Sequence, residues 1–165
     1  MPKYTFHRIT DIPPAFLGRL GIRLLMLDLD NTVMTYGEDL PSGDVLQWAA
    51  DIQNSGVKLF IVSNSRRVGR VERFAEFLGI GYIKAAGKPS PDGIIAAMRE
   101  ARSGAQESAF AGDQIFTDTL AANRAGVASI VVRPLCFSNL FIALRYVLEI
   151  PFRAVGGIKR NGYVI

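Results

Sequence analysis

Short apolar runs alternate along the chain with stretches in which apolar residues recur every three or four positions. Residues 22–28 and 57–63 are continuous apolar runs that end in polar residues, as in strands buried on both faces of a sheet. Shorter runs of this kind predict three more strands, at residues 80–84, 108–112 and 128–133. The pattern therefore predicts about five strands.

Helical spacing marks the segments between these runs. Ser42 can cap a helix that ends before Gly56, and Pro91 can begin another. Residues 120–125 form a further candidate helix, and one more is predicted from a set of apolar positions that precede a glycine: Val68, Val71, Phe74, Ala75 and Leu78. Alternating strands and helices predict an α/β fold, a three-layer Rossmann-like domain with a parallel sheet.

The length of 165 residues fits one domain. We divide it into a core over residues 1–133, with a lead-in at 1–21, and a basic amphipathic C-terminal extension over 134–165. A single cysteine excludes an internal disulfide and a cysteine-based zinc site. A single histidine disfavours a multi-histidine metal site or a histidine-dependent triad. Carboxylates, lysines, arginines and hydroxyls remain for chemistry.

The net charge of +4 lies entirely in the last fifth of the chain, because residues 1–132 hold 14 basic and 14 acidic residues. A basic tail on a neutral domain favours an anionic partner, either a phospholipid surface or nucleic acid, although a tail that only aids solubility fits equally well. Few aromatic residues stand among these charges, which disfavours nucleic acid. No secretory signal or transmembrane span is recognisable, so we expect a cytoplasmic protein, with peripheral association at the inner membrane surface left open.

Polar residues follow four of the predicted strands at their carboxyl ends. Asp28, Asp30 and Thr32 follow the first strand, and the other positions are Ser63 and Asn64, then Lys88, then Asp113 and Asp118. Parallel sheets place their sites at these strand ends, so one shared site explains the pattern. Clustered carboxylates without histidine or cysteine suit Mg²⁺, and a nearby lysine can balance charge on a carboxylate and a phosphate. An aspartate nucleophile that accepts a phosphoryl group is an established form of covalent catalysis.

These residues resemble the four motifs of the haloacid dehalogenase (HAD) superfamily of phosphohydrolases, over about residues 20–133. The resemblance implies a Mg²⁺-dependent phosphoric monoester hydrolase with an aspartyl-phosphate at Asp28. Asp30 would act as general acid and base and offer its backbone carbonyl to the metal. Ser63, Thr32 and Asn64 would bind the phosphoryl group, and Lys88 would steady Asp28. Asp113 and Asp118 would complete the metal site.

The gaps between the motifs, from Thr32 to Ser63 and from Ser63 to Lys88, each leave room for one helix and one strand. Neither gap holds a cap domain, so the chain is similar to the capless members of the superfamily, which tend to act on large or surface-borne phosphates. The lead-in at residues 9–22 and the string at 112–118 are similar to the YqeG-type phosphatases, relatives of the mitochondrial phosphatidylglycerophosphate phosphatase. That branch implies a phospholipid head group as substrate.

Two further features favour a lipid. The apolar stripe of residues 137–148 has basic neighbours, including Arg145 and Arg153, and fits a helix at a membrane interface; a terminal helix packed on the core is the alternative. Arg66 and Arg67 follow Ser63 and could bind a second phosphate, together with Arg70 and Arg73, which the spacing places on the same helix face as Arg66. The alternative for these arginines is a salt-bridged surface helix.

Two rival functions remain open at this stage. The chain could hydrolyse a soluble sugar phosphate or a nucleic-acid end through the same site. It could also be a non-catalytic binding module with this fold, although the intact set of Asp28, Asp30, Lys88 and Asp113 argues against decay of a site.

Overall fold

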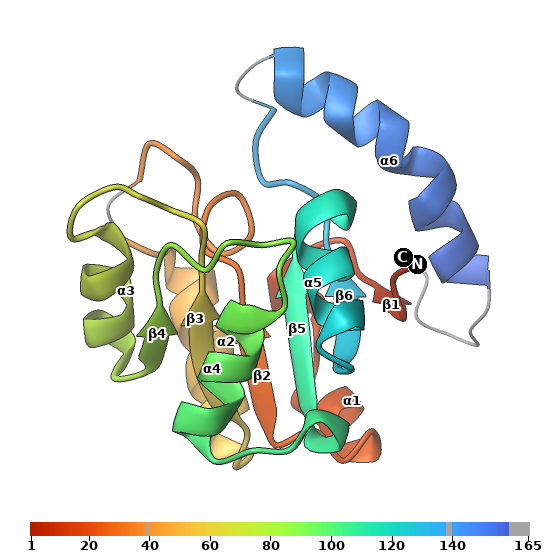
Figure 1. Cartoon of the computed structure of the whole chain (residues 1–165). Helices are drawn as coiled ribbons and strands as arrows, with labels where there is room; N and C mark the ends of the chain where they lie inside the picture. Colours follow the sequence, from red (N-terminus) through yellow and green to blue (C-terminus); the bar gives the residue numbers. More distant parts are fainter. Residues whose placement is uncertain (39, 138–139, 159–165) are drawn as a thin grey trace.

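The computed structural model describes residues 1–38, 40–137 and 140–158. Its six strands form one parallel sheet in the order β1-β6-β5-β2-β3-β4 (Figure 1). The strands are β1 (Tyr4–Thr5), β2 (Leu24–Leu27), β3 (Lys58–Val62), β4 (Gly81–Ile83), β5 (Ser108–Gly112) and β6 (Ala128–Val131). The predicted α/β class and parallel sheet are therefore confirmed.

The helices lie on both faces of the sheet (Figure 1). They are α1 (Pro14–Arg19), α2 (Gly43–Asn54), α3 (Arg70–Leu78), α4 (Asp92–Ala101), α5 (Leu120–Arg124) and α6 (Leu140–Ile158). Three short helical turns accompany them: η1 (Ile9–Asp11), η2 (Ala105–Glu107) and η3 (Ile115–Thr119), the last a π-helical turn. Helices α1, α2 and α3 pack on one face, and α4 and α5 pack on the other.

The central strand β2 explains why its apolar run is continuous. Leu25 and Leu27 lie in the core under α1, α2 and α3, whereas Leu24 and Met26 lie in the core under α4 and α5. Successive side chains of a strand point to opposite faces, so both faces must be apolar when both are covered. The chain builds β3 and β4 on one side of β2 and β5 and β6 on the other, which puts the switch in strand order at the carboxyl ends of β2 and β5.

Two details differ from the sequence-based expectation. The sixth strand, β1, lies in the lead-in and pairs with β6 through Tyr4 and Ile130; two half-buried residues leave too short a pattern to recognise. Helix α3 begins at Arg70 rather than at Val68, because Gly69 takes a left-handed conformation with φ of 72°. Val68 is consequently 97% exposed and does not belong to the apolar face of the helix.

Among the described residues, no helix is both long enough and apolar enough to cross a bilayer. The predicted C-terminal helix is present as α6, which lies outside β1 and β6 at the edge of the sheet (Figure 1).

Candidate active site

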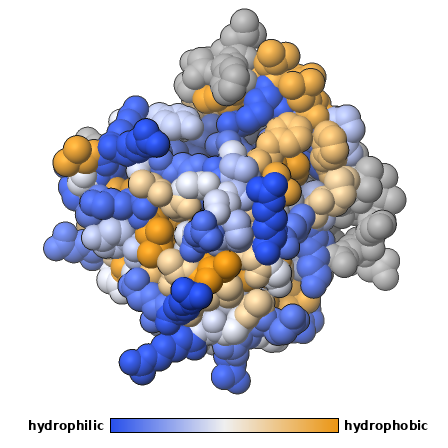
Figure 2. Space-filling view, viewed as in Figure 1, coloured by the Kyte–Doolittle hydropathy of each residue, from blue (hydrophilic) through white to orange (hydrophobic). Residues whose placement is uncertain are grey.

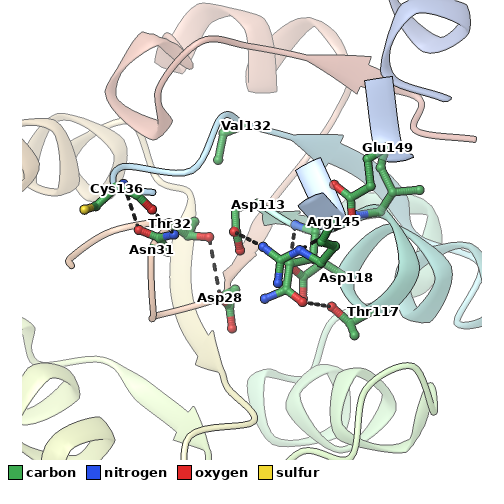
Figure 3. A network of polar contacts seen from close by, with 12 residues as sticks. Asp28, Asn31, Thr32, Asp113, Thr117, Asp118, Val132, Cys136, Arg145 and Glu149 are labelled. Carbon is green, nitrogen blue, oxygen red and sulfur yellow. Dashed lines mark hydrogen bonds and ion pairs between the residues drawn. The ribbon is translucent and has the colours of Figure 1, made fainter. Parts of the chain in front are cut away.

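Three carboxylates from two strand ends meet at the switch point of the sheet. Asp28 follows β2, Asp113 follows β5, and Asp118 comes from the η3 turn (Figure 3). One oxygen of each lies within 4.8 Å of the others, and all three residues are buried. We call Asp28, Asp113 and Asp118 the carboxylate triad. The sequence predicted that these residues share a site, and the fold brings them together.

Lys88 is a cation that contacts two carboxylates of this cluster. Its Nζ lies 2.6 Å from Asp28 Oδ1 and 2.8 Å from Asp118 Oδ1, and it stands 4.8 Å from the centre of the Phe110 ring. The side chain of Asn64 fixes the backbone of Lys88 with two hydrogen bonds, one donated to the Lys88 carbonyl and one accepted from its N–H, both 2.9 Å. Asn64 therefore positions Lys88 through both ends of its amide, a task that the sequence did not reveal.

Burial dominates the electrostatics of the triad. It raises the pKa of Asp28 to about 6, even though Lys88 acts in the opposite direction. Burial and then the charges of Asp118 and Asp28 raise the pKa of Asp113 well above its usual range. Burial would lower the pKa of Lys88, but the charges of Asp118 and Asp28 outweigh it and raise that pKa. The cluster therefore carries more negative charge than Lys88 alone offsets.

Asp118 reaches the triad because Gly112 has no side chain. A Cβ at Gly112 would lie 2.4 Å from Asp118 Oδ2, so the close approach requires glycine. The backbone N–H of Gln114 donates a hydrogen bond of 3.0 Å to the same oxygen. The segment from Gly112 to Asp118 thus shapes one wall of the site.

Thr32 lies buried beside Asp28, and Ser63 is buried at the end of β3, the strand next to β2. Thr32 Oγ1 is 3.5 Å from Asp28 Oδ2, a long contact. Ser63 follows β3, is 1% exposed, and its Oγ accepts a hydrogen bond of 3.0 Å from the N–H of Ser65. Asn31, next to Thr32, has φ of 67° and exchanges two hydrogen bonds with the backbone of Cys136, of 2.8 and 2.9 Å. Asn31 therefore ties the loop after β2 to the chain that leaves β6.

Asp30 forms an ion pair with Arg70, a residue that the sequence analysis considered as a ligand for a second phosphate. Arg70 Nε lies 2.9 Å from Asp30 Oδ1, while Arg70 Nη2 and Nη1 donate to the carbonyls of Thr35 and Glu38. Arg70 is 5% exposed, so its guanidinium is committed to the loop and is not offered to a second phosphate. It orients Asp30 instead. The Asp30 side chain stands outside the carboxylate triad.

Arg66 and Arg67 are exposed in the loop between β3 and α3. Arg67 donates a hydrogen bond to the carbonyl of Tyr36 and lies 5.9 Å from the centre of its ring. Burial, followed by the charges of Asp113, Asp30 and Asp28, raises the pKa of Tyr36. The half-buried Tyr36 is therefore close enough to feel the charges of these carboxylates, and Arg67 contacts it. No motif marked Tyr36 in the sequence.

Helix α6 sends an arginine directly to the site, which the sequence analysis did not foresee (Figure 3). Arg145 Nη2 lies 3.1 Å from Asp113 Oδ2 and its Nε lies 3.9 Å from Glu149. Arg153 pairs with Glu149 at 2.7 Å and donates to the carbonyls of Val132 and Asp113. The sequence predicted Arg145 and Arg153 as free basic flanks of an apolar stripe. In the structure both are ion-paired instead, and Arg153 is buried.

The triad suits a divalent cation. Within the described part of the chain, Asp113 Oδ1 is buried without a hydrogen-bond partner, although Arg145 holds the other oxygen of this carboxylate. An unpaired buried carboxylate oxygen is costly, and a metal ion at the triad would satisfy it. The ligands are all oxygens, as hard cations prefer. Asp28, Asp113 and Asp118 could hold such an ion through their side chains.

A family comparison agrees with this site. The model for haloacid dehalogenase-like hydrolases matches residues 14–126, which include every motif residue named above. The chain belongs to this hydrolase family. Its predicted membership of the HAD superfamily and its assignment as a phosphatase are thereby confirmed.

Relatives of this HAD hydrolase agree with the assignment. The chain is 30% identical over 164 residues to the probable phosphatase YqeG of Bacillus subtilis (strain 168), covering 99% of this chain and 94% of that protein.

Solved structures share the HAD fold at lower identity. The cobalt-bound deoxy-D-mannose-octulosonate 8-phosphate phosphatase of Haemophilus influenzae has a TM-score of 0.58 at 14% identity, covering 76% of this chain and 75% of that one. The 3-deoxy-D-manno-octulosonate 8-phosphate phosphatase of Yersinia pestis has a TM-score of 0.52 at 20% identity, covering 70% and 66%.

Proposed function

We propose that this HAD phosphatase is a Mg²⁺-dependent phosphomonoesterase that forms an aspartyl-phosphate at Asp28. The asymmetry of the Asp28 carboxylate carries the proposal. Lys88 Nζ lies 2.6 Å from Oδ1, whereas Oδ2 has a long contact of 3.5 Å with Thr32 Oγ1. Oδ2 is therefore the oxygen best placed to attack phosphorus.

The reaction has two steps. Asp28 Oδ2 forms a bond to phosphorus while the ester P–O bond breaks, and the leaving oxygen takes a proton from Asp30. A water then attacks the aspartyl-phosphate, Asp30 takes up a proton from that water, and inorganic phosphate leaves. Arg70 fixes the orientation of Asp30 for both transfers. The hydroxyl of Ser63, which follows the strand next to β2, binds the phosphoryl oxygens, and Lys88 balances charge on Asp28.

Mg²⁺ bound by the carboxylate triad, with the Asp30 carbonyl, would offset the negative charge of the phosphoryl group. Charge neutralisation and positioning supply most of the catalysis in phosphoryl transfer. The three carboxylates of the triad contact two cations, Lys88 and Arg145, and this excess of negative charge supports the assignment.

For the substrate we propose a phospholipid head-group phosphate, such as that of phosphatidylglycerophosphate, met at the cytoplasmic face of a membrane. Within residues 1–38 and 40–137, the motif gaps hold only α2 with β3 and α3 with β4, so neither gap contains a cap domain. A site without a cap domain suits a phosphate that is fixed to a surface. The exposed Arg66 and Arg67 supply positive charge for a second phosphate in the head group.

The test is phosphate release from phosphatidylglycerophosphate in mixed micelles, with and without Mg²⁺, beside a panel of soluble phosphomonoesters. We expect fast release from the lipid that requires Mg²⁺, and slow turnover of the panel. Release from the panel alone would reject the lipid and keep the phosphatase.

Variants at Asp28 test the covalent step. Asp28→Asn should abolish turnover and the acid-stable phosphoenzyme, whereas Asp44→Asn, at an exposed aspartate of α2, should leave both unchanged. Full activity of Asp28→Asn would disprove the aspartyl-phosphate.

A further inference from the structure

We propose that α6 is a docking helix whose outward face binds the surface of an anionic phospholipid bilayer beside the active site. This inference rests on the proposed phospholipid substrate, because it names the surface through which the enzyme would meet that substrate. Helix α6 is not long and apolar enough to cross a membrane. We therefore infer that it contacts the membrane–water interface.

The orientation of α6 is the first observation. The charged residues between 142 and 153 are Arg145, Glu149 and Arg153, spaced four apart on one face of the helix. All three turn inward: Glu149 is fully buried, and Arg145 and Arg153 reach Asp113. Glu149 also accepts a hydrogen bond of 2.9 Å from the N–H of Ile115. The helix is thus fastened to the domain mainly by its polar face.

The outward face of α6 is correspondingly apolar. It presents a set of large side chains that are each between 40% and 59% exposed: Leu144, Val147, Leu148, Ile150 and Phe152. Figure 2 shows hydrophobic residues gathered on the side of the molecule where Figure 1 places α6. A helix of a water-exposed surface normally has the opposite arrangement, with charges outside and apolar residues inside. A contiguous exposed apolar surface marks an interaction site.

This surface continues to the active site. Leu135 and Phe137, which are 39% and 50% exposed, lie in the segment between β6 and α6. The N–H of Leu135 donates a hydrogen bond of 3.0 Å to the carbonyl of Asn31, three residues after Asp28. The Phe137 ring meets Tyr146 of α6 edge-on at 5.1 Å. The apolar surface therefore begins at the loop that carries the nucleophile and runs along the helix.

Charge selects a bilayer as the occupant of this face. Arg145 and Arg153 are paired inside the molecule. The other basic residues of 133–165 are the exposed Arg133 ahead of α6, and Lys159 and Arg160 after it in the sequence. An apolar helix face with basic residues before and after it in the sequence matches an anionic lipid surface, where apolar side chains enter the acyl region and cations meet the head groups.

Vesicle flotation tests the proposal without any substrate present. The full-length protein is mixed with vesicles of phosphatidylcholine and phosphatidylglycerol, or of phosphatidylcholine alone. The double variant Leu144→Ser, Leu148→Ser changes two exposed residues of α6, and Phe77→Ser changes a residue of α3 that is 55% exposed. The oligomeric state of each protein is measured by sedimentation, and hydrolysis of p-nitrophenyl phosphate and the melting temperature are measured in parallel.

We expect the wild-type protein and Phe77→Ser to float with the anionic vesicles. The double variant should bind at least about tenfold more weakly, since each buried leucine side chain contributes roughly a factor of ten to transfer from water. Its hydrolysis of p-nitrophenyl phosphate and its melting temperature should match the wild type.

Three results would overturn the proposal. The wild type could fail to float, the double variant could float as well as the wild type, or α6 could hold together a wild-type dimer that the double variant splits. Failure of the proposed substrate gives a different result. If the protein floats with anionic vesicles but hydrolyses only soluble phosphomonoesters, the docking proposal stands and the lipid substrate is rejected.

Discussion

Replacing Glu149 by alanine should detach α6 from the domain. Glu149 is fully buried, pairs with Arg153 at 2.7 Å and accepts the Ile115 N–H at 2.9 Å. Removing one partner of a buried ion pair costs about 3–5 kcal/mol, and an unsatisfied buried N–H adds about 1–3 kcal/mol. Arg153 keeps hydrogen bonds to two backbone carbonyls, which favours the lower end, so we expect a loss of about 4 kcal/mol.

The decrease in unfolding free energy caused by Glu149→Ala has an upper bound, because α6 can leave the domain while the sheet stays folded. The measured decrease in unfolding free energy then equals the free energy that docks the helix. Glu149→Gln should cost less than Glu149→Ala, since its amide oxygen can still accept the Ile115 N–H. Val147→Ala, at a residue 58% exposed on the same helix, should change stability by less than about 0.5 kcal/mol.

Urea unfolding followed by circular dichroism and amide hydrogen exchange would measure both effects without metal. We expect the Ile115 amide of Glu149→Ala to exchange much faster than that of the wild type, with a lower urea midpoint whenever α6 unfolds together with the core. An unchanged urea midpoint together with an Ile115 amide as protected as in the wild type would refute the assignment of Glu149 as the anchor of α6.

Three further predictions concern the site. Gly112→Ala displaces a triad carboxylate, so its phosphatase activity should fall about 100-fold, whereas Gly104→Ala, with no atom within 4 Å, should match the wild type. Arg70→Met frees Asp30 and should lower kcat at least about tenfold with little change in KM; an unchanged kcat would contradict the positioning role. Because the pKa of Asp28 is raised from 3.8 to about 6, the folded state binds more protons than the unfolded chain across that range. Without metal the melting temperature should therefore fall as pH rises through it, while Mg²⁺ affinity measured by calorimetry should rise; an affinity that is equal at pH 5 and pH 7.5 would contradict this.

The sequence by itself determined five of the six strands and the carboxylates and lysine of the site. A strand buried on both faces must be apolar throughout. The apolar run of β2 could therefore be predicted as a strand without knowing which elements pack against it. The chemistry-bearing residues follow directly after such runs, and the carboxyl ends of parallel strands share one edge. Asp28, Lys88 and Asp113 could therefore be placed together before any distance was known.

The tertiary structure alone decided which charged groups pair. Arg70 lies 40 residues from Asp30, and Arg145 lies 32 residues from Asp113, so no local pattern specifies either ion pair. The periodicity of α6 was readable, but not which face it buries. An apolar stripe usually turns inward because burial of apolar surface is favourable, and here the buried carboxylates of Asp113 and Glu149 reverse that choice. Glu149 finds its arginines four residues away on the same helix. Asp113 becomes buried beside α6 only once the strands have folded, so the sequence could not show which face of α6 turns inward.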